Sequence, residues 1–259
     1  QVESKTFDAE VLLFQPAPAW RLPNKNAENP GNRGTNPPNG SVLHYWLKDD
    51  LPGDLQVELV ISDRDGNVIR RFTRKPEKVQ TEDKAPLGDD DRKLTARAGL
   101  NSFVWDMRYP SVTRFEKLVL WNDDLDGPKA VPGSYRATLK IGNGEGQSVD
   151  LEIRPDPRLN TSAADLQAQF AFTWGINRKL TETHESITRL RATRAQLDAL
   201  EKRIRGQDDY AALTEAAEAL KDQLTAIEEA LYQTKLEARQ DPLNFPIRLN
   251  GKLAGVMFE

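Results

Sequence analysis

The distribution of proline divides this chain into two parts that must fold differently. Prolines and glycines punctuate residues 1–157 at short intervals, whereas no proline occurs between Pro157 and Pro242. Proline removes a backbone donor and clashes with the preceding turn of a helix, so only the second stretch can hold long helices. The sequence therefore predicts a β-rich part followed by a helical part, an α+β, multi-domain chain with its boundary near residue 157.

Short segments of alternating apolar residues predict strands in the first part. Residues 55–61 alternate between apolar and polar side chains, as in a half-buried strand, and Asp65-Gly66 then supplies a tight turn into residues 68–72. Further strands are expected at 41–47, 98–107, 134–141 and 149–153, with a short strand or irregular edge at 115–121. Short strands separated by turns, with no helix between them, favour an antiparallel β-sandwich of immunoglobulin or fibronectin-III type over residues 41–157. Residues 1–40 are expected to be an N-terminal segment and a Pro/Gly/Asn-rich loop that join this sandwich.

Residues 158–240 carry the apolar spacing of two helices. Ser162 and Asp165 form a box-like helix start, Gly206 is placed to end the first helix, and Asp208 or Asp209 is expected to cap the second. Apolar residues of the second helix recur at alternating spacings of four and three, which indicates a seam against a partner helix: Leu213, Ala217, Leu220, Leu224, Ile227 and Leu231. One short connection predicts a long antiparallel helical hairpin. Residues 241–259 are expected to be an extended, truncated tail, because Asp241-Pro242 breaks the helix and apolar residues then alternate.

Composition excludes several classes of function. The chain has no cysteine, so disulfides, thiolate catalysis and cysteine-based zinc sites are excluded. Its net charge of −4 comes from nearly balanced acidic and basic residues, and the densest basic stretch, 189–205, is interleaved with leucines like a solvated helix face, so no nucleic-acid partner is expected. No apolar run approaches the length of a membrane span.

No catalytic residue and no cofactor can be assigned from the sequence. His44 and His184 are the only histidines, and their separation gives no metal-ligand spacing. A Gly-x-Ser-x-Gly nucleophile elbow is absent from the sequence. Asp123, Asp124 and Asp126 form an acidic loop that is a calcium candidate, although a solvated loop explains the same residues.

Three of the five tryptophans are candidates for ligand binding. Trp20, Trp46 and Trp121 lie beside expected loops, where exposed rings can stack on sugars; packing in a core or between domains is the alternative. Trp105 alternates in register with Phe103, which favours the core.

Several motifs resemble one family when they are taken in order. They are Asn-Pro-Pro-Asn-Gly-Ser-Val at 36–42, Tyr-Trp-Leu-Lys at 45–48, Gly-Leu-Asn-Ser-Phe-Val-Trp-Asp-Met-Arg-Tyr-Pro at 99–110, Val-Pro-Gly-Ser-Tyr at 131–135 and Asp-Pro-Leu-Asn-Phe-Pro-Ile at 241–247. The chain resembles the C-terminal region of large bacterial exported proteins with BNR/sortilin-like β-propellers, often labelled glycosyl hydrolases. The segment Trp-Asp-Met-Arg-Tyr-Pro is the most specific part of the resemblance.

The resemblance implies a β-propeller N-terminal to Gln1 and an exported, periplasmic or extracellular location. The glycosidase label belongs to the propeller, whose Ser-x-Asp-x-Gly-x-Thr-Trp boxes do not occur here, so no catalytic residue carries over. We interpret the matching residues as structural: Trp105 fills the core, Asp106 orders a turn or pairs with Arg108, and Tyr135 ties its hydroxyl to nearby backbone.

The resulting hypothesis is a non-catalytic structural or interaction module that packs against, or projects from, its own propeller. A protein or polysaccharide partner is also compatible with the sequence. The alternative function is a carbohydrate-binding accessory domain that uses the loop tryptophans.

Overall fold

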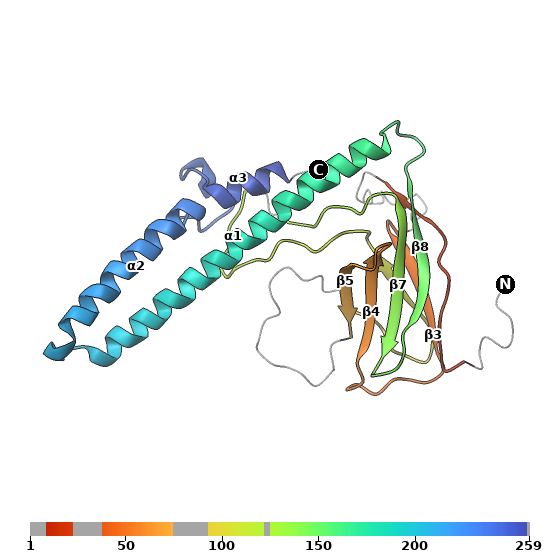
Figure 1. The fold of residues 1–259 in the computed structure, drawn as a ribbon, viewed down its shortest axis with the longest axis horizontal. Coiled ribbons are helices and arrows are strands. Elements are labelled where there is room, and N and C mark those ends of the chain that lie inside the picture. The colour runs from red at the N-terminus through yellow and green to blue at the C-terminus, as the bar shows by residue number, and fades with distance from the viewer. Residues whose placement is uncertain (1–8, 23–37, 75–92, 122–124, 258–259) are drawn as a thin grey trace. The chain divides into compact units, whose positions relative to one another are not determined.

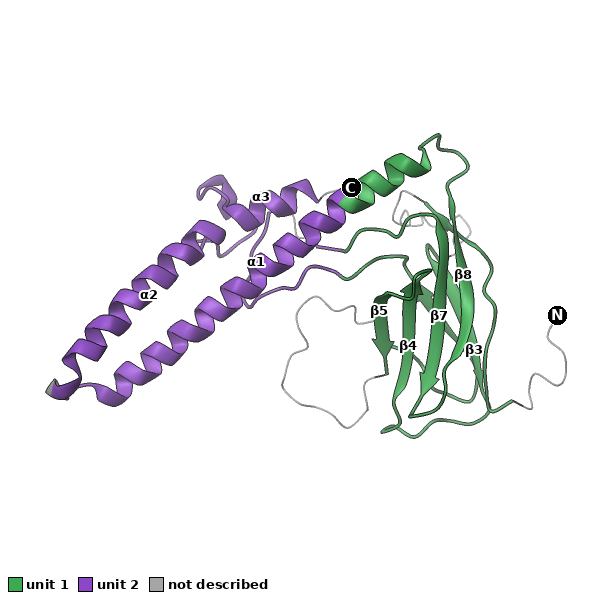
Figure 2. Cartoon of the chain, in the orientation of Figure 1, with its two compact units in different colours: residues 1–83, 90–110, 127–171 green, residues 84–89, 111–126, 172–259 purple. Residues whose placement is uncertain are grey.

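A computed structural model of the protein describes residues 9–22, 38–74, 93–121 and 125–257. Within these ranges the chain has two β-sheets and three α-helices and belongs to the α+β class (Figure 1). It divides into two compact units (Figure 2). The described part of unit 1 comprises residues 9–22, 38–74, 93–110 and 127–171, and that of unit 2 comprises residues 111–121, 125–126 and 172–257. Residues 111–121, 125 and 126 thus cluster with the helices, although the sequence places them inside the β-rich stretch.

Unit 1 contains both sheets. The first is antiparallel and has the order β1–β3–β6, formed by β1 (Val11–Leu13), β3 (Ser41–Leu47) and β6 (Gly99–Trp105). The second has the order β2–β8–β7–β4–β5, formed by β2 (Ala19–Arg21), β8 (Gln147–Pro155), β7 (Gly133–Ile141), β4 (Val57–Asp63) and β5 (Val68–Thr73). Its β2 runs parallel to β8 while the other pairs are antiparallel, so this sheet is mixed.

The predicted hairpin at Asp65-Gly66 is confirmed by the pairing of β4 with β5. Gly66 has φ +86°, a conformation that glycine adopts without the Cβ clash of other residues. The Asp63 carboxylate accepts hydrogen bonds from the backbone amides of Asp65 (3.0 Å) and Asn67 (2.9 Å), which fixes the turn.

One apolar core serves both sheets. Alternate residues of β3 are buried, because successive side chains of a strand point to opposite faces. The buried side chains come from every strand of unit 1 and include Leu43, Tyr45, Leu59, Ile61, Phe103, Trp105, Ala137, Leu139 and Leu151. The two sheets are therefore joined through a continuous cluster of buried side chains.

Three helices follow the sheets: α1 (Ala163–Ile204), α2 (Ala211–Leu231) and α3 (Leu249–Val256). The Ser162 Oγ accepts a hydrogen bond from the Asp165 amide (3.1 Å) and donates one to the Asp165 carboxylate (2.6 Å), so the expected helix start is confirmed. Gly206 follows the end of α1 with φ +79°, as its position predicts. The division between the units falls within α1, between Ala171 and Phe172.

Two small apolar clusters lie in unit 2, and both include residues of the 111–121 segment. Val112 and Leu120 belong to a cluster with Leu180 of α1 and Ala254 of α3. The other cluster consists of Phe115, Ile187, Tyr232 and Leu236. This segment does not form the strand or edge considered at 115–121, because its apolar residues pack against helices rather than pair with a neighbouring strand.

Other local expectations in the helical part are wrong. A 3₁₀ turn, η2 (Asp208–Tyr210), precedes α2, and Tyr210 occupies its N-cap without a side-chain hydrogen bond, so no aspartate caps this helix. The helix ends at Leu231, well before Asp241-Pro242, because Tyr232 adopts an extended backbone. The tail is not extended: η3 (Asp241–Leu243) and α3 lie within it. Among the described residues, no helix has the length and apolar character that crossing a membrane requires.

Candidate functional site

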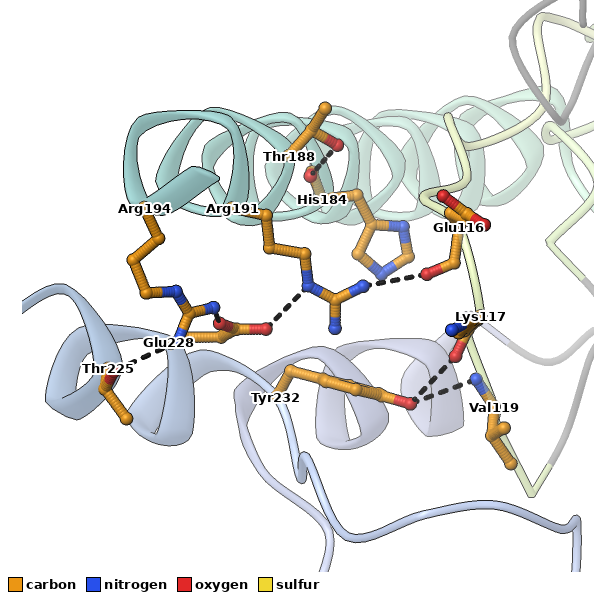
Figure 3. Close-up of polar contacts among 10 residues, drawn as sticks. All are labelled: Glu116, Lys117, Val119, His184, Thr188, Arg191, Arg194, Thr225, Glu228 and Tyr232. Atoms are coloured by element: carbon orange, nitrogen blue, oxygen red, sulfur yellow. Dashed lines mark hydrogen bonds and ion pairs between the residues drawn. The ribbon is translucent and has the colours of Figure 1, made fainter. Parts of the chain in front are cut away.

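A buried carboxylate joins α1 to α2 in unit 2. Glu228 of α2 is 1% exposed, and both of its carboxylate oxygens are occupied by arginines of α1 (Figure 3). Arg191 donates through Nε at 2.7 Å, and Arg194 donates through Nη2 to the other oxygen. Arg194 also donates to the Thr225 hydroxyl at 3.0 Å. A buried charge is tolerated when such partners compensate its lost hydration. Because Glu228 must remain next to both arginines, these contacts fix the register of α2 against α1.

Arg191 also connects the helices to the 111–121 segment. Its Nη1 donates to the Glu116 carbonyl at 2.8 Å (Figure 3), and its guanidinium carbon lies 4.8 Å from the centre of the Phe115 ring and 5.7 Å from that of Tyr232. The Tyr232 hydroxyl accepts from the Val119 amide at 3.2 Å and donates to the Lys117 carbonyl at 3.4 Å. Burial raises the pKa of this hydroxyl. Arg191 and Tyr232 therefore both hold the backbone of this segment through hydrogen bonds.

His184 is a second anchor for the same segment. Its side chain is fully buried, its ring meets Phe115 edge-on with centroids 5.0 Å apart, and its Nδ1 lies 2.7 Å from the Thr113 carbonyl. A carbonyl only accepts, so Nδ1 carries the proton. Burial lowers the pKa of His184 to about 4, and the ring is neutral at pH 7. Its Nε2 has no hydrogen-bond partner among the described residues.

An apolar groove of about 650 Å³ adjoins these anchors in unit 2. One wall is Val119, Leu120 and Trp121, which the Tyr232 hydroxyl positions through Val119. The remaining walls come from Gln233 and Leu236, from η3 and from α3 with the residues just before it. Gln233 donates through Nε2 to the Pro246 carbonyl at 3.1 Å, which ties the loop between η3 and α3 to the end of α2.

The groove combines exposed apolar side chains with cations. Leu243 is 74% exposed, Trp121 is 52% exposed and Ile247 is 38% exposed. Arg248 and Lys252 also line the groove and are exposed, and neither forms an ion pair with any residue that the structure describes. Such a surface can cover apolar groups and at the same time meet a carboxylate.

The tryptophan candidates do not all fall on this groove. Trp121 lines it, whereas Trp20 lies on β2 and Trp46 on β3, which belong to different sheets of unit 1. Trp20 is 43% exposed and has the Arg154 guanidinium 5.9 Å from its ring centre; Trp46 is half-buried. Carbohydrate binding through these three rings stays a prediction.

The residues of the Trp-Asp-Met-Arg motif lie in the core of unit 1 and beside it. Trp105 is fully buried, meets Tyr135 edge-on at 5.6 Å and donates from Nε1 to the Arg108 carbonyl at 3.2 Å. The Asp106 carboxylate accepts from the Arg108 amide at 3.0 Å, and the Arg108 guanidinium donates to the Gly127 carbonyl at 2.6 Å. The Tyr135 hydroxyl donates to the Val131 carbonyl at 2.8 Å. All these contacts organise the fold.

The calcium candidates are only partly described by the structure. Asp123 and Asp124 lie outside the described residues, and Asp126 is described. Within the described ranges, no group of three or more acidic or histidine side chains is arranged to hold a metal ion. The calcium hypothesis for this loop stays a prediction.

Comparison with known proteins adds no assignment. No protein-family model matches the chain, and no curated protein matches it either. The family resemblance in the sequence motifs therefore remains a hypothesis.

Sequence reasoning did not identify Glu228, Arg191, Tyr232 or the groove. A charged residue on a helix is usually solvated, and Glu228 is buried only because two arginines meet it. The available signal was the spacing of those arginines: Arg191 and Arg194 are three residues apart, so they lie on one face of α1.

Proposed function

We propose that this chain is a non-catalytic structural and interaction module of an exported protein, in which it accompanies a β-propeller. The observation that carries the proposal is the exposed apolar groove of unit 2, which is built on buried polar anchors. The motif resemblance supplies the propeller and the periplasmic or extracellular location, both of which remain part of the proposal.

Strand order supports a sandwich of immunoglobulin or fibronectin-III type for unit 1. In that fold the second strand pairs with the fifth in one sheet, while the third, sixth and seventh form the other. If β2 is taken as a detached part of the first strand, β1, β3 and β6 become strands A, B and E, and β4, β7 and β8 become C, F and G. Tyr135 then lies near the start of strand F, where a tyrosine corner is expected.

Ion pairs support an antiparallel helical hairpin for α1 and α2. Arg191 pairs with Glu228, while Lys221 pairs with Asp198 and Glu201. The residue number rises along α1 as it falls along α2, which is the order of antiparallel neighbours. Four residues, Gln207–Tyr210, separate Gly206 from the start of α2, and this short connection suits that topology.

The buried polar groups support a structural role rather than a chemical one. Glu228 is engaged on both oxygens by arginines, and His184 is fully buried and neutral at pH 7. A general base must reach a substrate proton, and neither group offers a free, accessible atom for that task. Their contacts instead position the segment that forms one wall of the groove.

The groove suits an extended peptide segment that carries apolar and acidic side chains. Its apolar residues provide the area for aliphatic or aromatic anchors, and Arg248 and Lys252 provide cations for carboxylates. In the proposed setting this segment belongs to the propeller or to its connection with this module.

A random 12-residue peptide display library, selected on the 259-residue chain, tests the groove. We expect enrichment of peptides with apolar and acidic residues, whose binding is lost in a Leu243→Glu/Ile247→Glu variant and weakened at least about 10-fold in Arg248→Glu/Lys252→Glu. Leu220→Glu on α2 is the matched control and leaves binding unchanged. Peptide binding that is equally strong in the Leu243→Glu/Ile247→Glu variant would contradict the proposal.

Limited proteolysis of the complete exported polypeptide tests the attachment to a propeller. A bound module is expected to be cleaved slowly at its junction and to stay associated after cleavage. Rapid release of an intact, freely tumbling fragment that contains both units would refute that attachment.

A further inference from the structure

The apolar seam of α2 is only half covered by α1. Ala217 is buried, and Leu224 and Leu231 are half-buried, as expected for a seam. The alternate seam positions are exposed: Leu213 by 42%, Leu220 by 40% and Ile227 by 50%. These three residues are spaced by seven and form one row along the helix. We name it the exposed α2 row.

Polar contacts explain why this row faces outward. Lys221 forms ion pairs with Asp198 and Glu201 of α1, at 3.3 and 2.6 Å. Thr225 and Glu228 accept hydrogen bonds from Arg194 of α1. Lys221 and Glu228 directly follow Leu220 and Ile227, and Thr225 precedes Ile227 by two positions. Side chains at such spacings point to different sides of a helix. The polar face is therefore directed to α1, and no residue that the structure describes covers the apolar row.

The surroundings of the exposed row suit close approach of further helices. The exposed residues of α2 include many alanines, which leave room for a neighbouring backbone: Ala212, Ala216, Ala219, Ala226 and Ala230. On α1, the residues Leu190, Leu197 and Ile204 are half-buried and also spaced by seven. Two helices with incompletely covered apolar rows are half of a four-helix bundle.

The exposed charges of α2 are acidic, whereas cations outnumber acids along the second half of α1. α2 exposes four acids, Glu215, Glu218, Asp222 and Glu229. The second half of α1 and the residue after it expose four cations, Arg189, Lys202, Arg203 and Arg205, and two acids, Glu185 and Asp198. The four acids of α2 and the four cations form no ion pair with another residue in the described ranges. The surface therefore carries an acidic helix beside one with an excess of unpaired cations, and it is complementary to its own copy.

We propose that a second copy of this chain covers the exposed α2 row, so that two pairs of helices form a four-helix bundle. A twofold axis along the helices places α2 of each copy against α1 of the other without changing residue levels. The ion pairs Arg191–Glu228 and Lys221–Asp198 show which residues lie at the same height along α1 and α2. By this alignment, Glu229 lies at the height of Arg189, and Glu215 lies at the height of Arg203. Each acidic stretch then meets a basic stretch of the partner. The proposal is independent of the groove and of the function proposed for it.

Sedimentation velocity of the 259-residue chain over about 1 to 200 µM tests the association. We expect a concentration-dependent dimer whose dissociation constant rises at least about 100-fold in Leu220→Glu/Ile227→Glu, because the carboxylates would be buried in the interface. Both residues are exposed in the single chain, so helix content by circular dichroism should be retained. Leu243→Glu, on the groove, is the control and leaves the dimer intact. A monomeric wild type, a dimer in Leu220→Glu/Ile227→Glu, or a dimer lost in Leu243→Glu overturns the proposal.

A charge-exchange experiment identifies the partner as a second copy. Glu215→Lys/Glu218→Lys makes both helices basic, and Lys202→Glu/Arg203→Glu makes both acidic. Each variant alone is expected to dimerise at least about 10-fold more weakly, and an equimolar mixture is expected to form a heterodimer, since unlike helices again face each other. A mixture that associates no better than the separate variants overturns the arrangement.

Discussion

The two units are stabilised by different kinds of interaction. In unit 1, side chains from two sheets form one continuous apolar core. In unit 2, the apolar clusters are small, and the buried polar side chains of His184, Glu228 and Gln233 hold different segments together. Apolar burial is non-directional, whereas hydrogen bonds and ion pairs require particular partners. Unit 1 should therefore respond to lost volume, and unit 2 to lost charge or altered pH.

Trp105→Ala should cause the largest effect. The side chain is fully buried, and its removal leaves a cavity beside Tyr135 and an unpaired Arg108 carbonyl. We expect a loss of about 3–5 kcal/mol in the free energy of unfolding, measured by urea titration of near-UV circular dichroism. Trp20→Ala, at an exposed position of the same unit, should cost much less. Equal losses in the two variants would mean that unit 1 does not depend on its core.

Glu228→Gln probes the ion pairs of unit 2. The amide keeps the shape of the side chain but removes the charge that two arginines share. The arginine side chains are 32% and 26% exposed, so water compensates them in part, and we expect a loss of about 2–3 kcal/mol. Urea unfolding followed at 222 nm measures it. Glu229→Gln, next to it and exposed, should change stability by no more than about 0.5 kcal/mol.

The pH dependence of unit 2 should follow His184. Its pKa is about 4 in the folded chain against an ordinary value of 6.5. Between these two pH values, His184 therefore binds a proton in the unfolded chain but not in the folded chain. Stability is retained above pH 6.5 and falls as the pH decreases toward 4, by about 2 kcal/mol between pH 7.5 and pH 5. Urea midpoints across this range measure the slope.

His184→Gln should remove this part of the slope, and His44→Gln, at an exposed strand position, should leave it intact. A wild-type slope unchanged by His184→Gln would show that other groups carry the pH dependence.

Tyr232→Phe should give the smallest effect. The ring and its packing against Phe115 stay, but the Val119 amide loses its acceptor. We expect a loss of about 1 kcal/mol, read from the thermal midpoint of the helical signal, and Tyr210→Phe at an exposed position should be neutral. If Tyr232→Phe is also neutral, the hydroxyl does not hold the groove wall in place.

Sequence patterns predicted the strands of unit 1 well because its core obeys a simple periodicity. Residues 41–47 coincide with β3, and the expected strands at 55–61, 68–72 and 134–141 differ from β4, β5 and β7 only at their ends. Side chains that alternate along a strand report directly which face is buried. The parallel pairing of β2 with β8 was not predicted, because a three-residue strand carries too little pattern.

Unit 2 was predicted less well because its contacts do not follow one period. Phe115, Leu118 and Val119 pack on different helices, so their spacing fits neither a strand nor a helix. Leu213, Leu220 and Ile227 follow the heptad rule and are nevertheless exposed, since Glu228 and Lys221 determine which face meets α1. Polar pairing overrides the apolar pattern at these positions.

The hydrogen bond between Val119 and Tyr232 also sets an order of assembly during synthesis. The two residues are 113 positions apart, and the cluster of Val112 and Leu120 includes Ala254, which is made later still. The last strand of unit 1 ends at Pro155, so every strand of that unit is synthesised before the helices that residues 111–121 contact. Closing such distant contacts is slow. Throughout that interval Phe115 and Leu120 are exposed on a nascent chain, where a chaperone has its best opportunity to bind.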